Sequence, residues 1–121
     1  MVDMKKYIVA ADCGTTGSKA VVYDMIGKAI ASGYQEYGLE FPQSGWVDQD
    51  PKMLFETLIL VINQAVHTAN IEPQDVEAIC LSTQRCTLIC VDKAGNPLRK
   101  GISWQDNRTD QQCDIIRRRI G

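Results

Sequence analysis

The chain has 121 residues, enough for one domain but few for an enzyme with a cleft between two domains. Its 13 basic and 15 acidic residues give a net charge of -2, so it lacks the concentrated positive charge of a nucleic-acid-binding protein. With no secretory signal, no apolar run long enough to span a bilayer and five cysteines without a CxxC pair, we expect a cytoplasmic protein with reduced thiols and no membrane partner.

The first third of the chain has the pattern of three strands joined by two short turns. Residues 7–11 form an apolar run, residues 19–24 alternate between two faces, and residues 29–37 can form a third strand. Turn residues stand between these runs, at 14–17 and 26–28. Two tight turns in succession predict an antiparallel three-stranded meander.

A long amphipathic helix is predicted over residues 51–69. Asp50 and Pro51 form an N-cap followed by proline at the first helical position. The apolar positions recur at helical spacing: Leu54, Leu58, Val61, Ile62 and Ala65. Residues 76–81 predict a fourth strand, and the helix before it is long enough to be a crossover connection. We therefore predict an α/β fold with a mixed sheet.

The last third of the chain predicts a hairpin and a helix. Residues 87–91 and 98–104 flank a polar turn at 92–97. A helix is expected from about Arg108, with Gly121 at its C-cap position. The strand-like surroundings of Cys13, Cys80 and Cys90 predict small core residues.

Residues 12–19, directly after the first strand, have a composition suited to binding phosphate. A carboxylate such as Asp12 at the end of a buried strand can hold Mg²⁺, directly or through water. Gly14 and Gly17 allow the backbone to approach a phosphate, and successive amides in such a turn form a concavity for anions. Hydroxyl donors and a positive charge are supplied by Thr15, Thr16, Ser18 and Lys19. These groups suit phosphoryl transfer, in which the protein mainly positions groups and offsets charge.

Spacing alone does not distinguish this reading from a structural turn. The segment is not a P-loop, because Ser18 precedes Lys19 and a strand, rather than a helix, follows. Glycine and threonine are common turn residues, so an ordinary hairpin turn explains the pattern equally well.

Four segments in order resemble motifs of the FGGY carbohydrate kinases. Residues 12–19 resemble the Asp-x-Gly-Thr-Thr-x-Ser-Arg/Lys motif that opens the family, and residues 45–51 resemble its Gly-Trp-Val-Glu-x-Asp-Pro segment. Residues 79–85 resemble the strand that leads to the sugar-contacting Gln-Arg or Gln-Met, and residues 102–108 resemble the Trp-x-Asp-x-Arg motif. The first motif is shared with the wider superfamily of sugar kinases, Hsp70 and actin, whereas the ordered set is specific to the FGGY kinases.

The resemblance implies a ribonuclease-H-like fold and ATP-dependent phosphorylation of a sugar or polyol hydroxyl, with ATP and Mg²⁺ as cofactors. Residues 1–121 would be the N-terminal part of the sugar-binding domain, leaving that domain incomplete and the second domain absent. Asp12 would lie near the metal and the transferred phosphate. The nucleotide phosphates would contact the turn and its flanks: Gly14, Thr15, Thr16, Gly17, Ser18 and Lys19. The family's catalytic base has no counterpart here, so we expect the chain alone to be inactive.

The resemblance also places the substrate. Gln84, Arg85 and the position of Cys86 would face the substrate hydroxyls, and the family match favours Trp104 as an apolar wall over the alternative of a core residue. Asp106 would be either a hydroxyl acceptor or a structural partner of Arg108. Glycerol kinases carry Glu at the position of Cys86 and xylulokinases carry Met-His at 85–86, so the identity of the sugar stays open.

Two alternatives accompany this interpretation. The Asp-x-Gly-Thr turn also occurs in nucleotide-dependent switch modules of the actin and Hsp70 superfamily, which bind nucleotide without a sugar. In addition, an incomplete domain would leave a sheet edge uncovered, and such an edge favours self-association, for example as a homodimer.

Overall fold

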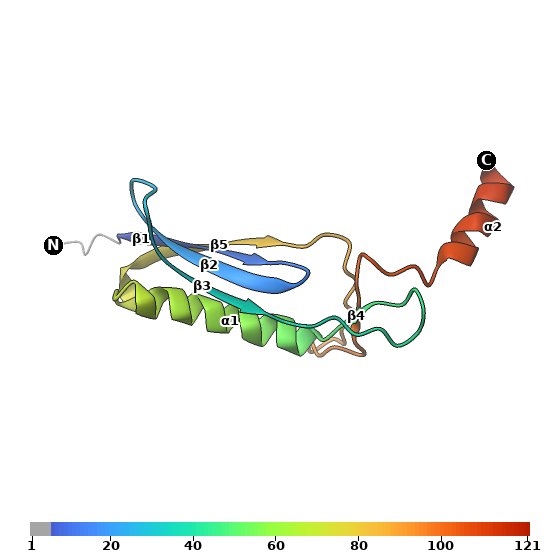
Figure 1. Ribbon diagram of the computed structural model, residues 1–121, viewed down its shortest axis with the longest axis horizontal. Helices are drawn as coiled ribbons and strands as arrows, with labels where there is room; N and C mark the ends of the chain where they lie inside the picture. The colour runs from blue at the N-terminus through green and yellow to red at the C-terminus, as the bar shows by residue number, and fades with distance from the viewer. Residues whose placement is uncertain (1–5) are drawn as a thin grey trace. The chain divides into compact units, whose positions relative to one another are not determined.

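The structure is a computed structural model that describes residues 6–121. The described chain forms two compact units (Figure 1). The first contains the described residues through Tyr37 together with Lys52–Gln84, and the second contains Gly38–Pro51 and Arg85–Gly121.

The first unit is built on a four-stranded mixed sheet with strand order β3-β2-β1-β5 (Figure 1). The strands are β1 (Tyr7–Cys13), β2 (Gly17–Asp24), β3 (Ala29–Glu36) and β5 (Val76–Thr83). The first three pair antiparallel, and β5 pairs parallel to β1. The predicted meander and mixed sheet are therefore confirmed.

Helix α1 (Pro51–Thr68) covers one face of this sheet and closes the core of the first unit. Val61 and Ala65 are fully buried against Val9 and Val22, which point from β1 and β2 toward the helix. The predicted apolar stripe is thus the face that the helix buries, and the helix ends one residue before the predicted boundary. A short 3-10 helix, η1 (Pro73–Asp75), follows and leads into β5.

Strand β5 is exposed along most of its length, so the predicted burial of its cysteine was wrong. Cys80 is exposed, although the apolar run around it has the pattern of a buried strand. Ile79 and Leu81 pair with Val9 and Ala11 of β1, yet 52% and 59% of their surface is exposed. The reason is position, because β5 is an edge strand and the core packed by α1 lies over β1 and β2. Cys90, in the second unit, is exposed as well.

The second unit contains a small antiparallel pair that the sequence did not predict. β4 (Asp48–Gln49) pairs with β6 (Gly101–Ile102). The predicted hairpin of residues 87–91 and 98–104 is confirmed in part. The two segments pair antiparallel at Leu88 and Ile102, and the Leu98 amide donates to the Cys90 carbonyl, but they form no continuous ladder within the described residues and Ile102 also pairs with β4. Its turn does form, because the Asp92 carboxylate accepts hydrogen bonds from the backbone amides of Ala94 and Asn96 at 2.8 and 2.9 Å.

Helix α2 (Asp110–Ile120) ends the described chain, near the predicted position. Gly121 has φ 91° and donates its amide to the Arg117 carbonyl at 2.9 Å, which confirms the predicted C-cap. Among residues 6–121, no helix combines the length and apolar character that crossing a bilayer requires.

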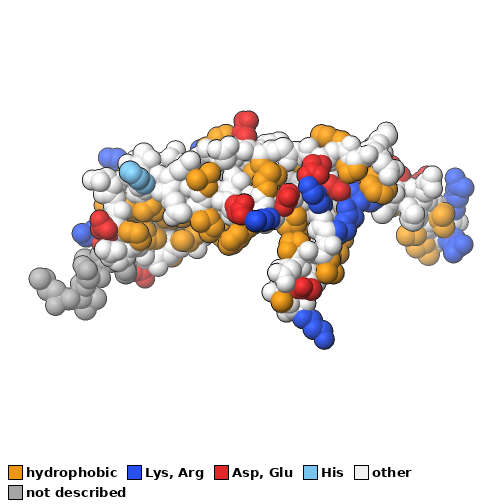
Figure 2. Space-filling model, turned by 90° about the horizontal axis from the view of Figure 1, so that it is seen from below, with side chains coloured by type: hydrophobic (Ala, Val, Ile, Leu, Met, Phe, Trp, Pro, Cys, Tyr) orange, Lys and Arg blue, Asp and Glu red, His pale blue; other side chains and the backbone are white. Residues whose placement is uncertain are grey.

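Both units leave large apolar side chains at the surface. On α1 these are Phe55, Ile59 and Leu60, on the side of the helix away from the core. Figure 2 shows hydrophobic side chains interspersed with charged and polar ones on one face of the molecule.

Candidate functional site

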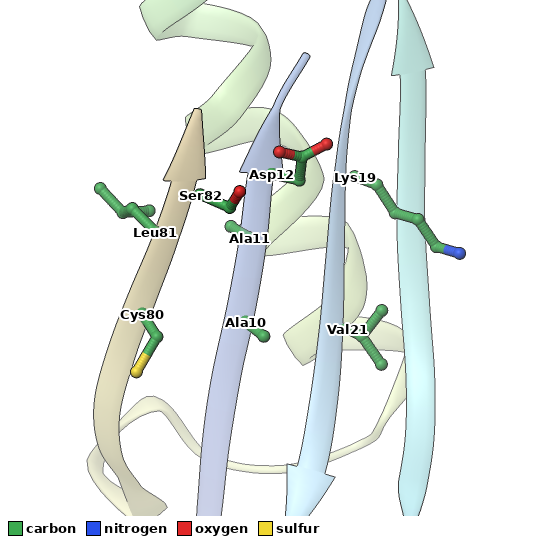
Figure 3. Close-up of a pocket in the computed structure, with 8 residues that line it drawn as sticks. All are labelled: Ala10, Ala11, Asp12, Lys19, Val21, Cys80, Leu81 and Ser82. Carbon is green, nitrogen blue, oxygen red and sulfur yellow. The ribbon is translucent and has the colours of Figure 1, made fainter. Parts of the chain in front are cut away.

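Asp12 lies exposed near the carboxyl end of β1, on the sheet face opposite α1. It borders an open hollow of about 310 Å³ whose lining is mostly apolar (Figure 3). Because β5 runs parallel to β1, the carboxyl ends of the two strands meet at the same edge, and Ser82 lies directly beside Asp12 in the register. Carboxyl ends of parallel strands are where open α/β sheets bind ligands.

Lys19 faces Asp12 across the antiparallel pair of β1 and β2. Its side chain nevertheless extends away from the carboxylate, toward the side of β3, in Figure 3. Among residues 6–121, no ion pair joins Asp12 to a basic side chain. The carboxylate is therefore available for a ligand outside the chain.

The turn between β1 and β2 is closed by a hydrogen bond from the Gly14 amide to the Gly17 carbonyl at 3.0 Å. Neither glycine has a positive φ. A Cβ at Gly17 would lie 2.8 Å from the Gln35 carbonyl oxygen, and one at Gly14 would lie 3.0 Å from the Gly17 carbonyl oxygen. Glycine at 17 is therefore required by close packing against β3, a reason that the sequence pattern did not reveal.

Ser18 points to the opposite side of the sheet from Asp12. It is fully buried, and its hydroxyl donates to Tyr37 Oη at 3.5 Å. Tyr37 in turn donates its hydroxyl to the Gly14 carbonyl and its backbone amide to the Thr16 carbonyl. Ser18 thus supports the turn from beneath, while Thr16 is exposed and Thr15 half-buried.

The pKa of Tyr37 is raised to about 12, mainly because the hydroxyl is partly buried. The hydrogen bond from Ser18 lowers this pKa, whereas Cys13 and the charge of Asp12 raise it further. Tyr37 therefore stays protonated at neutral pH and acts as a hydrogen-bond donor to the turn. Tyr37 has no distinctive signal in the sequence, because an aromatic residue at the end of a strand is ordinary.

The predicted substrate residues fall into both units. Gln84 is the last residue of the first unit. Its backbone amide donates to the Cys13 carbonyl, directly before the turn, at 3.0 Å. Arg85 and Cys86 follow in the second unit and are exposed. Cys86 has φ 61°, the left-handed region that non-glycine residues seldom occupy and that recurs in ligand-binding segments.

Trp104 is a surface residue rather than part of a core. It keeps 53% of its surface exposed, and its amide donates to Thr87 Oγ1 at 3.3 Å. The exposed indole can therefore contact a ligand.

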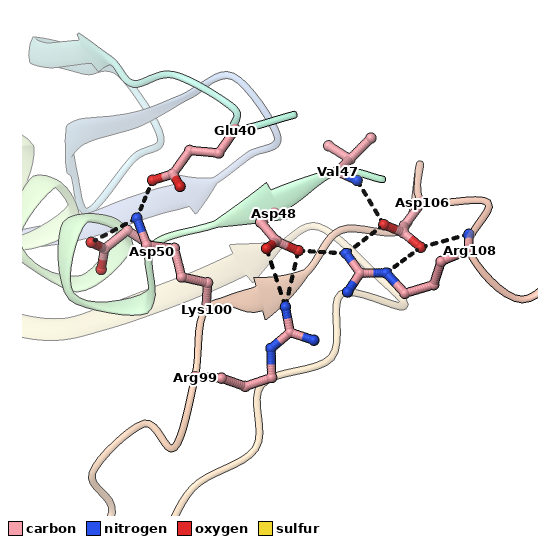
Figure 4. A network of polar contacts seen from close by, with 8 residues as sticks. All are labelled: Glu40, Val47, Asp48, Asp50, Arg99, Lys100, Asp106 and Arg108. Carbon is pink, nitrogen blue, oxygen red and sulfur yellow. Dashed lines mark hydrogen bonds and ion pairs between the residues drawn. The ribbon is translucent and has the colours of Figure 1, made fainter. Parts of the chain in front are cut away.

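Asp106 is the most enclosed of the predicted site residues in the second unit, with a side chain only 3% exposed (Figure 4). It accepts hydrogen bonds from the Val47 amide at 2.6 Å, from the Arg108 amide at 2.9 Å and from Arg108 Nε at 2.8 Å. Arg108 adds an ion pair to the same carboxylate at 2.7 Å. These bonds use the acceptor capacity of the carboxylate and make Asp106 a structural partner of Arg108.

The charges of this cluster stabilise one another. The hydrogen bonds from Arg108 hold the pKa of Asp106 far below its usual range, and burial opposes this less strongly. The same hydrogen bonds raise the pKa of Arg108 further above its ordinary value. Both groups therefore remain charged throughout the physiological range.

Asp48 links this pair to a wider network that was not predicted from the sequence. Its carboxylate forms an ion pair with Arg108 at 2.5 Å. Both of its oxygens also accept hydrogen bonds from Arg99 Nη2 at 3.1 Å (Figure 4). The Arg108 guanidinium also stacks on the Trp46 ring, 4.1 Å from its centroid. Lys100 pairs with Glu40. A sequence signal existed, because Trp46 and Asp48 lie in the Gly-Trp-Val-Asp segment.

Among the residues that the structure describes, no three His, Cys, Asp or Glu side chains gather into a metal cage. Asp12 is the single carboxylate of the hollow in the first unit. One carboxylate completed by water and phosphate oxygens is an ordinary donor set for Mg²⁺, so the residues present fit that ion only as a partner of a phosphate ligand.

Comparison with known proteins gives a consistent result. Residues 7–121 match the model of the N-terminal domain of the FGGY family of carbohydrate kinases. A glycerol kinase from Sinorhizobium fredii is 39% identical over 116 residues, covering 95% of this chain and 23% of the relative. A glycerol kinase from Thermoanaerobacter pseudethanolicus is 42% identical over 115 residues, covering 94% and 23%.

Solved structures agree with the sequence relatives. Gluconate kinase from Lactobacillus acidophilus superposes with a TM-score of 0.86 at 32% identity, covering 94% of this chain and 23% of that one. Plasmodium falciparum glycerol kinase with ADP superposes with a TM-score of 0.82 at 21% identity, covering 95% and 23%, which supports the fold alone. The predicted fold of the sugar kinase superfamily is confirmed, and the chain spans about 23% of the length of these relatives.

Proposed function

Because this chain belongs to the FGGY family of carbohydrate kinases, we propose that the complete protein transfers the γ-phosphate of ATP to a hydroxyl of a sugar or polyol. The observation that carries the proposal is the placement of Asp12. Its exposed carboxylate stands at the carboxyl end of β1, beside an open hollow and directly before the glycine-threonine turn.

Phosphoryl transfer of this kind requires no covalent bond between the protein and the transferred group. The acceptor hydroxyl attacks the γ-phosphorus, the bond from that phosphorus to the ADP oxygen breaks, and the hydroxyl proton leaves to a base. Positioning and charge compensation supply the acceleration. Mg²⁺, when bound with ATP, would offset the phosphate charge, and Asp12 would hold it directly or through water.

The nucleotide phosphates would be bound by the turn and one lysine: Gly14, Thr15, Thr16, Gly17 and Lys19. Lys19 reaches them only if its flexible side chain turns from the direction in Figure 3. Ser18 is left out of the contacting set, because it is fully buried and donates to Tyr37. Its role would be to support the turn.

The acceptor would be bound by Gln84, Arg85, Cys86 and the exposed face of Trp104. Asp106 would keep Arg108 and the Val47 segment in place instead of contacting the acceptor. The relatives are named for glycerol, gluconate and xylulose, which together define a class of polyhydroxylated compounds of three to six carbons. Cys86 stands where the glycerol kinases carry Glu, and a thiol is a weaker acceptor than a carboxylate.

The chain itself would form the N-terminal part of the sugar-binding domain of a two-domain cytoplasmic enzyme. It spans about 23% of its relatives, and the groups that complete the nucleotide site and the base would come from the remaining length. We therefore propose that these 121 residues alone do not turn over ATP.

The test is ATP turnover by the complete protein against a panel of polyols, pentuloses, hexuloses and aldonates. At least one compound should raise turnover well above the rate with ATP alone. Asp12→Ala should lower kcat by about 100-fold or more, since it removes an electrostatic group at the transferring phosphate, and should leave acceptor binding by calorimetry within about twofold. ATP turnover that is indifferent to every compound would instead indicate a nucleotide-dependent switch.

A further inference from the structure

Tyr37 holds the turn of residues 14–17 at two points. Its backbone amide donates to the Thr16 carbonyl at 3.0 Å, and its hydroxyl donates to the Gly14 carbonyl. One residue at the end of β3 therefore fixes two of the peptide groups of a turn that belongs to β1 and β2.

The hydroxyl is placed for this role by its surroundings. It is half-buried, it lies 3.5 Å from Ser18 Oγ, which donates to it, and it lies 3.7 Å from Cys13 Sγ. Because Ser18 donates a hydrogen bond to the Tyr37 oxygen, the hydroxyl hydrogen of Tyr37 is directed at the Gly14 carbonyl. A hydroxyl that both accepts and donates in a half-buried site has a single favoured orientation.

Fixing a carbonyl also fixes the amide on the other side of the same peptide. The Gly14 carbonyl and the Thr15 amide belong to one planar trans peptide, in which the C=O and N–H bonds point in opposite directions. The hydrogen bond from Tyr37 to Gly14 therefore sets the direction of the Thr15 amide. The bond to the Thr16 carbonyl sets the direction of the Gly17 amide in the same way.

We infer that Tyr37 is a positioning residue for the phosphate-binding turn, whose residues 14–17 it holds in the conformation that receives the terminal phosphates of the nucleotide. The inference rests on the proposed function for the ligand, and on the hydrogen bonds above for the geometry. Tyr37 does not itself contact the phosphates. Its effect should therefore be confined to ligands that carry them.

The experiment compares Tyr37→Phe with wild type in the complete protein. Phenylalanine keeps the ring and the backbone amide, and it removes the hydroxyl that donates to Gly14 and accepts from Ser18. We expect the Kd of a non-hydrolysable ATP analogue, measured by calorimetry, to rise about 3- to 10-fold, the loss that one hydrogen bond causes. The Kd of adenosine, which has no phosphate, should stay within about twofold. Amide exchange of residues 14–17 should accelerate.

Tyr23→Phe is the matched control, because it removes a hydroxyl from β2 that makes no hydrogen bond to the turn in the described chain. It should change neither affinity. An unchanged analogue affinity in Tyr37→Phe, or an equal loss for adenosine, would contradict the inference while leaving the proposed function intact. Wild type that binds neither the analogue nor ATP would overturn the proposed function and the phosphate role of Tyr37 together.

Discussion

Gly33 lies where β3 passes closest to α1. A Cβ at this position would lie 2.4 Å from the Val61 carbonyl oxygen and 2.9 Å from Gln64 Cβ. The first of these atoms is backbone, so it cannot move aside without bending the helix. We expect Gly33→Ala to lower the free energy of unfolding of the first unit by about 3 kcal/mol, the upper range for overpacking.

Thermal unfolding of the complete protein, followed by circular dichroism, would measure this loss. Gly38→Ala is the control, because a Cβ there meets nothing within 4 Å. That change should stay within about 0.5 kcal/mol of wild type. Equal melting temperatures for the two variants would show that the close approach of β3 to α1 is misplaced.

Asp106 makes the second unit sensitive to acid in a defined direction. Arg108 lowers the pKa of this carboxyl in the folded protein, so its ionised form stabilises the fold above the pKa of the unfolded state, about 4. That contribution disappears as the pH falls below about 4 toward the depressed folded pKa. Asp106→Asn should therefore cost stability at neutral pH, and the cost should shrink only under acid conditions.

Hydrogen exchange of the Val47 amide, which donates to Asp106, is the local measurement. Its protection factor should fall about 10- to 100-fold in Asp106→Asn at pH 7, the loss expected for a charged hydrogen bond. The ratio of wild type to variant should be constant between about pH 5 and 8 and should decrease below about pH 4. A ratio that grows on acidification would have the wrong sign for a carboxyl with a lowered pKa.

Helix α1 and the meander could be predicted from the sequence because their periodicity is long and their packing is local. Val61 and Ala65 recur at helical spacing, and Val9 and Val22 alternate with more exposed neighbours. Strands β4 and β6 have two residues each, too few for any period, and they pair across a separation of more than fifty positions. The pairing of Ile102 with Asp48, in addition to Leu88, was therefore outside the reach of local patterns.

The residues of the candidate site also differ in whether local sequence patterns could predict them. Asp12 and the turn after it follow from a short contiguous motif, whereas Tyr37 and Asp48 act through partners that lie far away in the sequence. The motif alone did not predict the orientation of Ser18. It lies among donors of suitable chemistry, but the alternation of β2 turns it into the core.

The buried stripe of α1 gives a direct test of the core. Val61→Ala removes two methyl groups from a fully buried side chain packed near Val9 and Val22, and it should cost about 2 kcal/mol. Ile59→Ala removes more apolar volume from a partly exposed position on the same helix. It should cost less than about 1 kcal/mol. Urea unfolding followed by the loss of helical signal would compare the two, and a larger cost for Ile59 would reverse the assigned faces of α1.

The four-stranded sheet of the first unit has β3 and β5 at its edges. Among the described residues β5 has a strand on one side only, and its apolar side chains Ile79 and Leu81 are exposed. Such an edge is a template for pairing with another chain. In relatives that are about four times longer, the additional length can cover it. We therefore expect the 121-residue polypeptide, studied by itself, to self-associate through β5.

Sedimentation velocity over a range of concentrations would detect this association as a rising weight-average mass. Leu81→Lys should shift the polypeptide toward monomer, because a lysine on an edge strand opposes pairing. Ile26→Lys is the matched control, since Ile26 is a more exposed apolar residue at the turn between β2 and β3, away from the β5 edge. If both lysines had the same effect, association would follow from general hydrophobicity and not from the edge. Monomers at every concentration would mean that β5 is protected within these residues.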